Sequence, residues 1–183
     1  MLRYSNVFNL SQTEGINLPA SALQETRTNN PIEDCEQIVA AMPNRPALEQ
    51  SDKAWYAPGR DAVGMPSIGL FRSSEEYYST FFHELTHSTG HKSRLGREGF
   101  ESVQSFGSES YSKEELVAEM GAAMLCGVTG IENRTLENSA AYLKTWIQRL
   151  RSDSRLIVTA ASAAQKAADY ILDKQHSTES EKN

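Results

Sequence analysis

The sequence has few cysteines and no long hydrophobic run. Only Cys35 and Cys126 occur among 183 residues, far apart in sequence, which argues against a disulfide framework, and we expect two buried thiols in a reducing compartment. No apolar run approaches the ~18–20 residues of a transmembrane helix, and the N-terminal residues lack the apolar core of a signal peptide. The sequence therefore predicts a soluble cytoplasmic protein that does not enter a membrane.

An excess of basic residues is also missing. Lysine and arginine total 18 against 24 aspartates and glutamates, which gives a net charge of −6. Nucleic-acid-binding modules usually carry a basic surface, so we expect no direct nucleic-acid binding by this chain alone. The acidic residues are dispersed rather than clustered, which argues against a DNA mimic.

The length fits one domain, which we place at residues 1–173, with a frayed, disordered tail at 174–183. Periodicity and turn signals predict a mostly helical α+β domain with a small sheet. The expected elements are a strand within residues 1–20, a helix at 31–42, two strands joined by a turn between 54 and 71, and helices at 73–90, about 112–127, about 138–151 and about 155–173.

Three of the four histidines lie within residues 77–92, and two of them belong to the motif HELTH, residues 83–87. Residues four apart share one helix face, so His83 and His87 can point at one metal ion. Glu84 is rotated by ~100° from His83 and can act on a water molecule beside the pair as a general base. Imidazole donors favour zinc, one ion per chain. The alternatives are a chance histidine pair on a helix surface and a purely structural zinc site.

A third protein ligand is needed, and His91 is one candidate. The longer pattern HExxHxxGxxH would place its third histidine at the position of Ser93, whereas His91 lies only four residues after His87. We therefore interpret His91 mainly as a rim residue or a solvated histidine at the helix end. Cys126 is a weaker candidate, because it lies 11 residues beyond Glu115, ~16 Å along a helix.

The next predicted helix offers two carboxylates on one face, Glu115 and Glu119. One could bind the metal while the other accepts a hydrogen bond from a metal-binding histidine, and spacing alone does not decide which. Glu115 could instead cap the helix start with Ser112, and Glu119 could be a solvated glutamate.

Four segments occur in the order typical of one family: VFNLSQTEGI, YYSTFFHELTHSTGHKSRLGRE, YSKEELVAEMGAAMLC and AAYLKTWIQRL. Together they resemble the metallopeptidase domain of ArdC-type antirestriction proteins, which are related to the polyvalent-protein metallopeptidases of plasmids and phages. The resemblance covers about residues 3–172. It implies a zincin-like fold of the glutamate type, in which Glu115 is the metal ligand and Glu119 supports a metal-binding histidine without binding the metal itself. It also implies a substrate extended along an edge strand at the cleft, which we place at Ala62–Met65.

The family also has an N-terminal domain that binds single-stranded DNA, and this chain begins where that domain would have ended.

From the motif and the resemblance we expect a zinc-dependent metallopeptidase from a mobile element, with a protein or peptide substrate and an antirestriction role. Tyr142, His91 and Arg155 are candidates, on chemistry alone, to stabilise the transition state, although the spacing of Tyr142 to Trp146 favours a core position. The alternative is a metal-stabilised protein that blocks a restriction factor without cleaving it. The sequence does not indicate an oligomeric state, a cleavage preference or the physiological metal.

Overall fold

The computed structural model describes residues 27–97, 109–131 and 154–174. The strand predicted within residues 1–20, the helix predicted at 138–151 with Tyr142, and residues 175–183 of the tail lie outside the described residues. The elements in chain order are α1 (Glu33–Ala41), β1 (Ala47–Gln50), β2 (Trp55–Ala57), β3 (Ala62–Met65), the 3-10 helix η3 (Ile68–Leu70), α2 (Ser74–Ser88), α3 (Glu109–Val128) and α5 (Ser154–Ile171).

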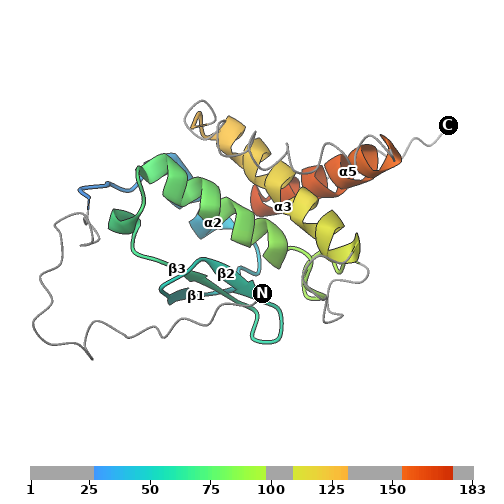
Figure 1. Cartoon of the computed structure of the whole chain (residues 1–183), viewed down its shortest axis with the longest axis horizontal. Coiled ribbons are helices and arrows are strands. Elements are labelled where there is room, and N and C mark those ends of the chain that lie inside the picture. Colours follow the sequence, from blue (N-terminus) through green and yellow to red (C-terminus); the bar gives the residue numbers. More distant parts are fainter. Residues whose placement is uncertain (1–26, 98–108, 132–153, 175–183) are drawn as a thin grey trace, which may run out of the picture.

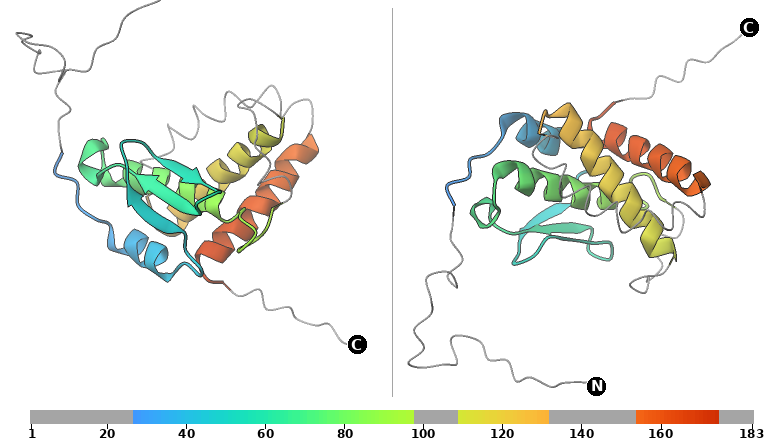
Figure 2. Two further views of the ribbon diagram at one scale, coloured as in Figure 1. Left: turned by 90° about the horizontal axis from the view of Figure 1, so that it is seen from below. Right: turned by 45° about the horizontal axis from the view of Figure 1, so that its top comes forward.

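Helix α2 lies between a small sheet and a pair of helices (Figure 1). The sheet has the order β1-β3-β2, with β1 parallel and β2 antiparallel to β3. Helices α3 and α5 run side by side on the other side of α2 (Figure 2). This arrangement confirms an α+β domain with a small mixed sheet. None of the described helices combines the length and apolar character needed to cross a membrane.

The antiparallel pair of β2 and β3 confirms the two strands expected between residues 54 and 71. The edge-strand prediction for Ala62–Met65 is wrong, because β3 is the central strand and all four of its residues are buried. Within the described residues the sheet edges are β2 and β1. Strand β1 was not predicted, since its four residues are all exposed and show no apolar alternation.

Helix α2 begins where its local sequence predicts. The Ser73 hydroxyl accepts a hydrogen bond from the Glu76 N–H at 3.2 Å, which satisfies one free amide of the first turn. Tyr78, Phe82 and Leu85 recur at helical spacing and are fully buried. This apolar stripe fixes the rotation of α2 and so determines where the HELTH side chains point.

Helix α3 begins at Glu109, so the predicted start with Ser112 as a cap is wrong by three residues. The helix crosses α2 closely at Gly121, where an added Cβ atom would lie 2.5 Å from Cγ2 of Thr86. Thr86 belongs to the HELTH turn and is fully buried. The missing side chain at Gly121 therefore allows the close approach that brings the α3 glutamates beside HELTH.

Candidate metal centre

His83 and His87 on α2 converge with Glu115 on α3. Their Nε2 atoms are 3.1 Å apart, and Glu115 lies 3.7 Å from Nε2 of His83 through Oε2 and 3.5 Å from Nε2 of His87 through Oε1. Ligand atoms bound at ~2.0–2.2 Å to one tetrahedral ion lie about 3.4 Å from one another. The spacing of these donor atoms therefore fits a single divalent cation.

A second carboxylate lies behind each imidazole. Glu119 Oε1 is 3.5 Å from Nδ1 of His83, and Glu114 Oε1 is 3.2 Å from Nδ1 of His87. Each ring thus directs Nε2 toward Glu115 and Nδ1 toward an outer carboxylate. Such pairing fixes the ring orientation and makes the inner nitrogen a better metal ligand.

Glu114 and its partner Arg97 are residues that the sequence interpretation missed. Arg97 donates from Nε to Glu114 Oε2 at 2.9 Å, and its Nη2 also contacts Oε1. The same guanidinium donates to the carbonyl of Thr86 at 3.0 Å near the end of α2, where carbonyl groups lack helical partners. The pair of glutamates at 114 and 115 was visible in the sequence, but adjacent helical residues point in directions about 100° apart.

Neighbouring carboxylates set the protonation of the metal-free centre. Burial lowers the pKa of His87, but hydrogen bonds with Glu114 and Glu115 outweigh it and raise the pKa to about 9. Burial raises the pKa of Glu114, but hydrogen bonds with His87 and Arg97 outweigh it and hold the pKa below its ordinary value. Glu114 therefore stays charged, and the proton on His87 must leave before the ring can bind a cation.

Glu84 lies next to the imidazole pair but outside the set of converging donors. Burial raises the pKa of its carboxyl group, Glu115 adds to this, and the two histidines oppose it. The main-chain N–H of Tyr56, on strand β2, hydrogen-bonds the Glu84 carboxylate. A buried carboxylate with a raised pKa is suited to accept and return a proton near neutral pH.

His91 belongs to a different cluster beyond the end of α2. Its Nδ1 atom lies 2.7 Å from the Ser93 hydroxyl and 3.8 Å from Oδ2 of Asp61, and it is absent from the converging set. Cys35 and Cys126 are free thiols buried in the core, as expected, and they are absent from that set too. Burial raises the pKa of Cys35 to about 11.

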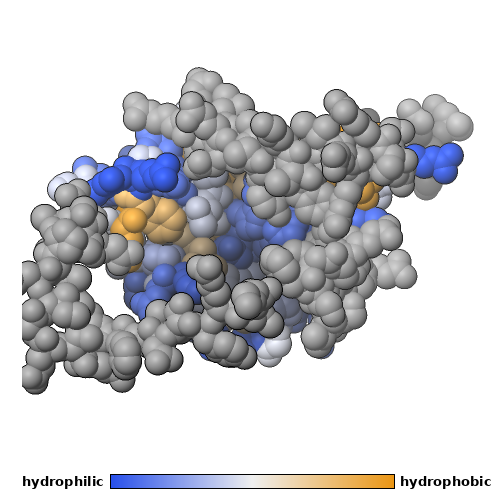
Figure 3. All heavy atoms as spheres, viewed as in Figure 1, coloured by the Kyte–Doolittle hydropathy of each residue, from blue (hydrophilic) through white to orange (hydrophobic). Residues whose placement is uncertain are grey.

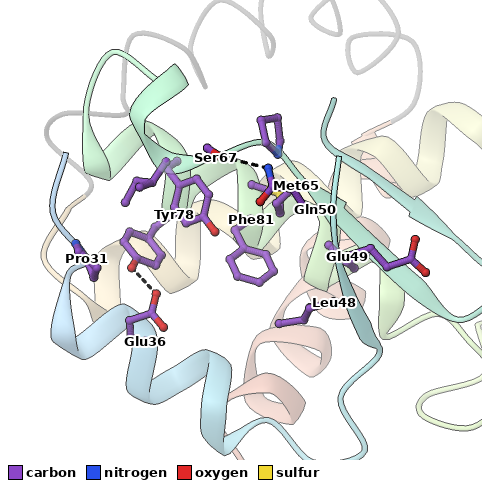
Figure 4. Close-up of a pocket in the computed structure, with 13 residues that line it drawn as sticks. Pro31, Glu36, Leu48, Glu49, Gln50, Met65, Ser67, Tyr78 and Phe81 are labelled. Atoms are coloured by element: carbon purple, nitrogen blue, oxygen red, sulfur yellow. Dashed lines mark hydrogen bonds between the residues drawn. The ribbon is translucent and has the colours of Figure 1, made fainter. Parts of the chain in front are cut away.

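Hydrophilic residues gather beside a smaller hydrophobic patch among the described residues visible on one face (Figure 3). A cavity of about 470 Å³ lies between α1, α2 and the sheet (Figure 4). None of the HELTH residues lines this cavity. Its carboxylates already have partners, because Glu36 accepts a hydrogen bond from the Tyr78 hydroxyl and Glu49 pairs with Arg60 at 3.3 Å. The chemistry of the converging donors, rather than cavity size, therefore identifies the candidate site.

Comparison with known proteins gives consistent matches. A family model described as zincin-like metallopeptidase matches residues 33–163. Among curated relatives, two proteins named DNA primase TraC from Escherichia coli are 37% and 38% identical over 92% of this chain, which covers 11% and 15% of their lengths. An uncharacterised protein of Sinorhizobium fredii is 34% identical over 92% of the chain and 53% of its own length.

Two crystal structures of the antirestriction protein ArdC from plasmid R388 are also similar. The Mn(II)-bound structure is 40% identical with a TM-score of 0.65 and matches 79% of this chain and 53% of ArdC. The metal-free structure is 37% identical with a TM-score of 0.63 and matches 91% and 58%. The chain thus spans a small part of the TraC proteins and about half of the other relatives.

Proposed function

Because the chain belongs to the zincin-like metallopeptidase family, we propose that it hydrolyses peptide bonds with one zinc ion held by His83, His87 and Glu115. The observation that carries the proposal is the convergence of these three side chains from two helices at the spacing of ligands around one ion. The outer carboxylates of Glu114 and Glu119 support it, since they orient the two imidazoles.

Glu84 is the proposed general base. A bound divalent cation would polarise the scissile carbonyl group and acidify the attacking water. Glu84 accepts a proton from that water at its carboxylate as the new C–O bond forms, and it then delivers the proton to the leaving nitrogen as the C–N bond breaks. The raised pKa of Glu84 supports both halves of this transfer.

Zinc is proposed on the chemistry of the donors. Two imidazoles and one carboxylate form a set of three protein ligands that leaves a coordination position open, as catalytic zinc sites do. The same nitrogen and oxygen donors also suit manganese, and the ArdC structure was obtained with Mn(II). Metal content after purification without added metal distinguishes the two ions.

The proposed substrate is an extended peptide beside strand β2. Strand β2 is an edge of the described sheet, it contacts α2, and its residue Tyr56 reaches Glu84 through the main chain. An added peptide strand would therefore bring its backbone alongside the catalytic base. This placement of the substrate along β2 replaces the expected placement along Ala62–Met65, because those residues form the central strand.

The proposed biological role is antirestriction in the cytoplasm of a cell that carries a mobile element. The role is supported by similarity to ArdC from plasmid R388. Cleavage of a host protein is the first hypothesis, and binding of a host factor without cleavage is the alternative. We do not assign DNA binding to this chain, whose net charge is −6.

The test compares wild type with Glu84→Gln on a library of unfolded proteins and peptides. We expect both proteins to retain one zinc ion, while Glu84→Gln lowers kcat by ~10²–10⁴-fold because the base is lost. Glu75→Gln, about two and a half turns earlier on α2, is the matched control and should behave as wild type. Full activity of Glu84→Gln would overturn the mechanism.

A second assay separates catalysis from binding. Protection of incoming DNA in cells should be lost with Glu84→Gln if cleavage is required. Protection that survives Glu84→Gln but fails with His83→Ala would favour the metal-stabilised binding protein.

A further inference from the structure

A fully buried guanidinium joins four parts of the chain beside the metal centre. The side chain of Arg94 has 0% exposure. It donates from Nε to the carbonyl of Ser88 at the end of α2, at 2.7 Å, and from Nη1 to the carbonyl of Asn44 ahead of β1, at 2.8 Å. Its Nη2 lies 3.3 Å from the Tyr56 hydroxyl on β2, and both Nη atoms contact Asp61.

Asp61 receives this guanidinium at the turn between β2 and β3. It has a φ of 48°, in the left-handed region that aspartate and asparagine tolerate better than most residues. Its carboxylate accepts hydrogen bonds from Arg94 at 3.1 Å and from the Tyr56 hydroxyl at 2.9 Å. Burial raises the pKa of Asp61, but these two hydrogen bonds outweigh it and keep the carboxyl group charged.

Tyr56 connects this cluster to the catalytic base. Its hydroxyl is held by Arg94 and Asp61, and its main-chain N–H hydrogen-bonds Glu84. Strand β2 has three residues and one neighbour, β3, among the described strands. The contact between the Tyr56 hydroxyl and Arg94 connects the strand to the residues that follow α2.

We propose that Arg94 and Asp61 are positioning residues, which hold β2 against α2 so that the Tyr56 N–H orients the Glu84 carboxylate. The inference rests on the role proposed for Glu84. A shift of about 1 Å in a catalytic group can lower a rate by about 10²-fold, so loss of a tether of this kind should slow the chemical step. Arg94→Lys keeps the charge but loses the planar fork that joins the four segments.

The first experiment does not depend on catalysis. Amide hydrogen exchange is followed by NMR in the 183-residue chain for wild type, Glu84→Gln, Arg94→Lys and Asp61→Asn. Asparagine tolerates the backbone of residue 61, so Asp61→Asn tests the charge rather than the turn. We expect exchange at Tyr56 to accelerate about tenfold in all three variants. The Ser51 amide, which donates to the Met65 carbonyl at 2.9 Å, should be unchanged and reports an intact sheet.

The matched control is Arg60→Lys, because Arg60 lies on the same turn in an exposed pair with Glu49. It should leave exchange at Tyr56 at the wild-type rate. Unchanged exchange at Tyr56 in both Arg94→Lys and Asp61→Asn would overturn the positioning role, whatever the protein cleaves.

The second experiment uses a peptide substrate. Asp61→Asn and Arg94→Lys should lower kcat by about 10–10²-fold with one metal ion still bound. Because the proposed substrate also lies along β2, KM can rise, but by a smaller factor than kcat falls. A raised KM with unchanged kcat, or loss of the metal, would contradict the inference. If wild type cleaves nothing, the proposed function fails, while the exchange experiment still decides whether the cluster positions Glu84.

Discussion

Glu114 Oε1 lies 3.2 Å from Nδ1 of His87, and the next residue, Glu115, lies 3.5 Å from Nε2 of the same ring. Two consecutive carboxylates of α3 thus face the two nitrogens of one imidazole. Arg97 holds the outer carboxylate through two of its nitrogens. The orientation of His87 therefore depends on a pair of residues that bind no metal themselves.

Glu114→Gln tests this dependence. The amide should leave the fold intact but lower metal affinity by ~10–100-fold, because His87 loses a charged acceptor behind its ring. Competition with a chromogenic chelator measures the affinity. Glu33→Gln, at an exposed position in the first turn of α1, is the control. Wild-type affinity in Glu114→Gln would show that the contact does not support the site.

Metal binding should also depend on pH. A proton held by His87 must leave before the imidazole can bind a cation, and its pKa in the metal-free protein is raised to about 9. Affinity should therefore rise about tenfold per pH unit from pH 7 to about 9 and then level off. Calorimetry in buffers of different ionisation enthalpy should detect release of about one proton at pH 7. No proton release would contradict this account.

Gly121→Ala tests the helix crossing. The new methyl group would meet Thr86 at 2.5 Å, so we expect a loss of ~1–3 kcal/mol in the free energy of unfolding and weaker metal binding. Gly127→Ala is the matched control on the same helix, since an added Cβ there meets nothing within 4 Å. Urea unfolding of both variants measures the difference.

Thr86→Ala should partly rescue Gly121→Ala, because it removes the atoms that the new methyl group meets. A double-mutant cycle with additive effects would show that the two residues do not constrain each other.

The features that the sequence could predict depend on residues that lie close together in the chain. The Ser73 cap and the stripe through Tyr78 and Leu85 lie within one helix, so they predict α2 and the shared face of His83 and His87. The four-residue spacing of Glu115 and Glu119 likewise predicts that both carboxylates face the same way. The structure places Glu115 nearest the inner nitrogens and Glu119 beside Nδ1 of His83.

The remaining features depend on tertiary packing. The rotation of α3 that turns Glu114 toward His87 is set where Gly121 crosses Thr86, far along the helix. The order of strands is equally non-local, so the buried run at Ala62–Met65 could be recognised as a strand but not as the central one. Arg94 follows α2 in sequence, and only the fold brings Asp61 to it.

X-ray absorption spectroscopy of the zinc-loaded protein tests the central claim most directly. The account predicts two imidazole nitrogens at ~2.0–2.1 Å and one carboxylate oxygen at ~2.0–2.2 Å, with the oxygen ligand lost and the affinity greatly lowered in Glu115→Ala. A sulfur ligand, or a spectrum and affinity unchanged in Glu115→Ala, would contradict it.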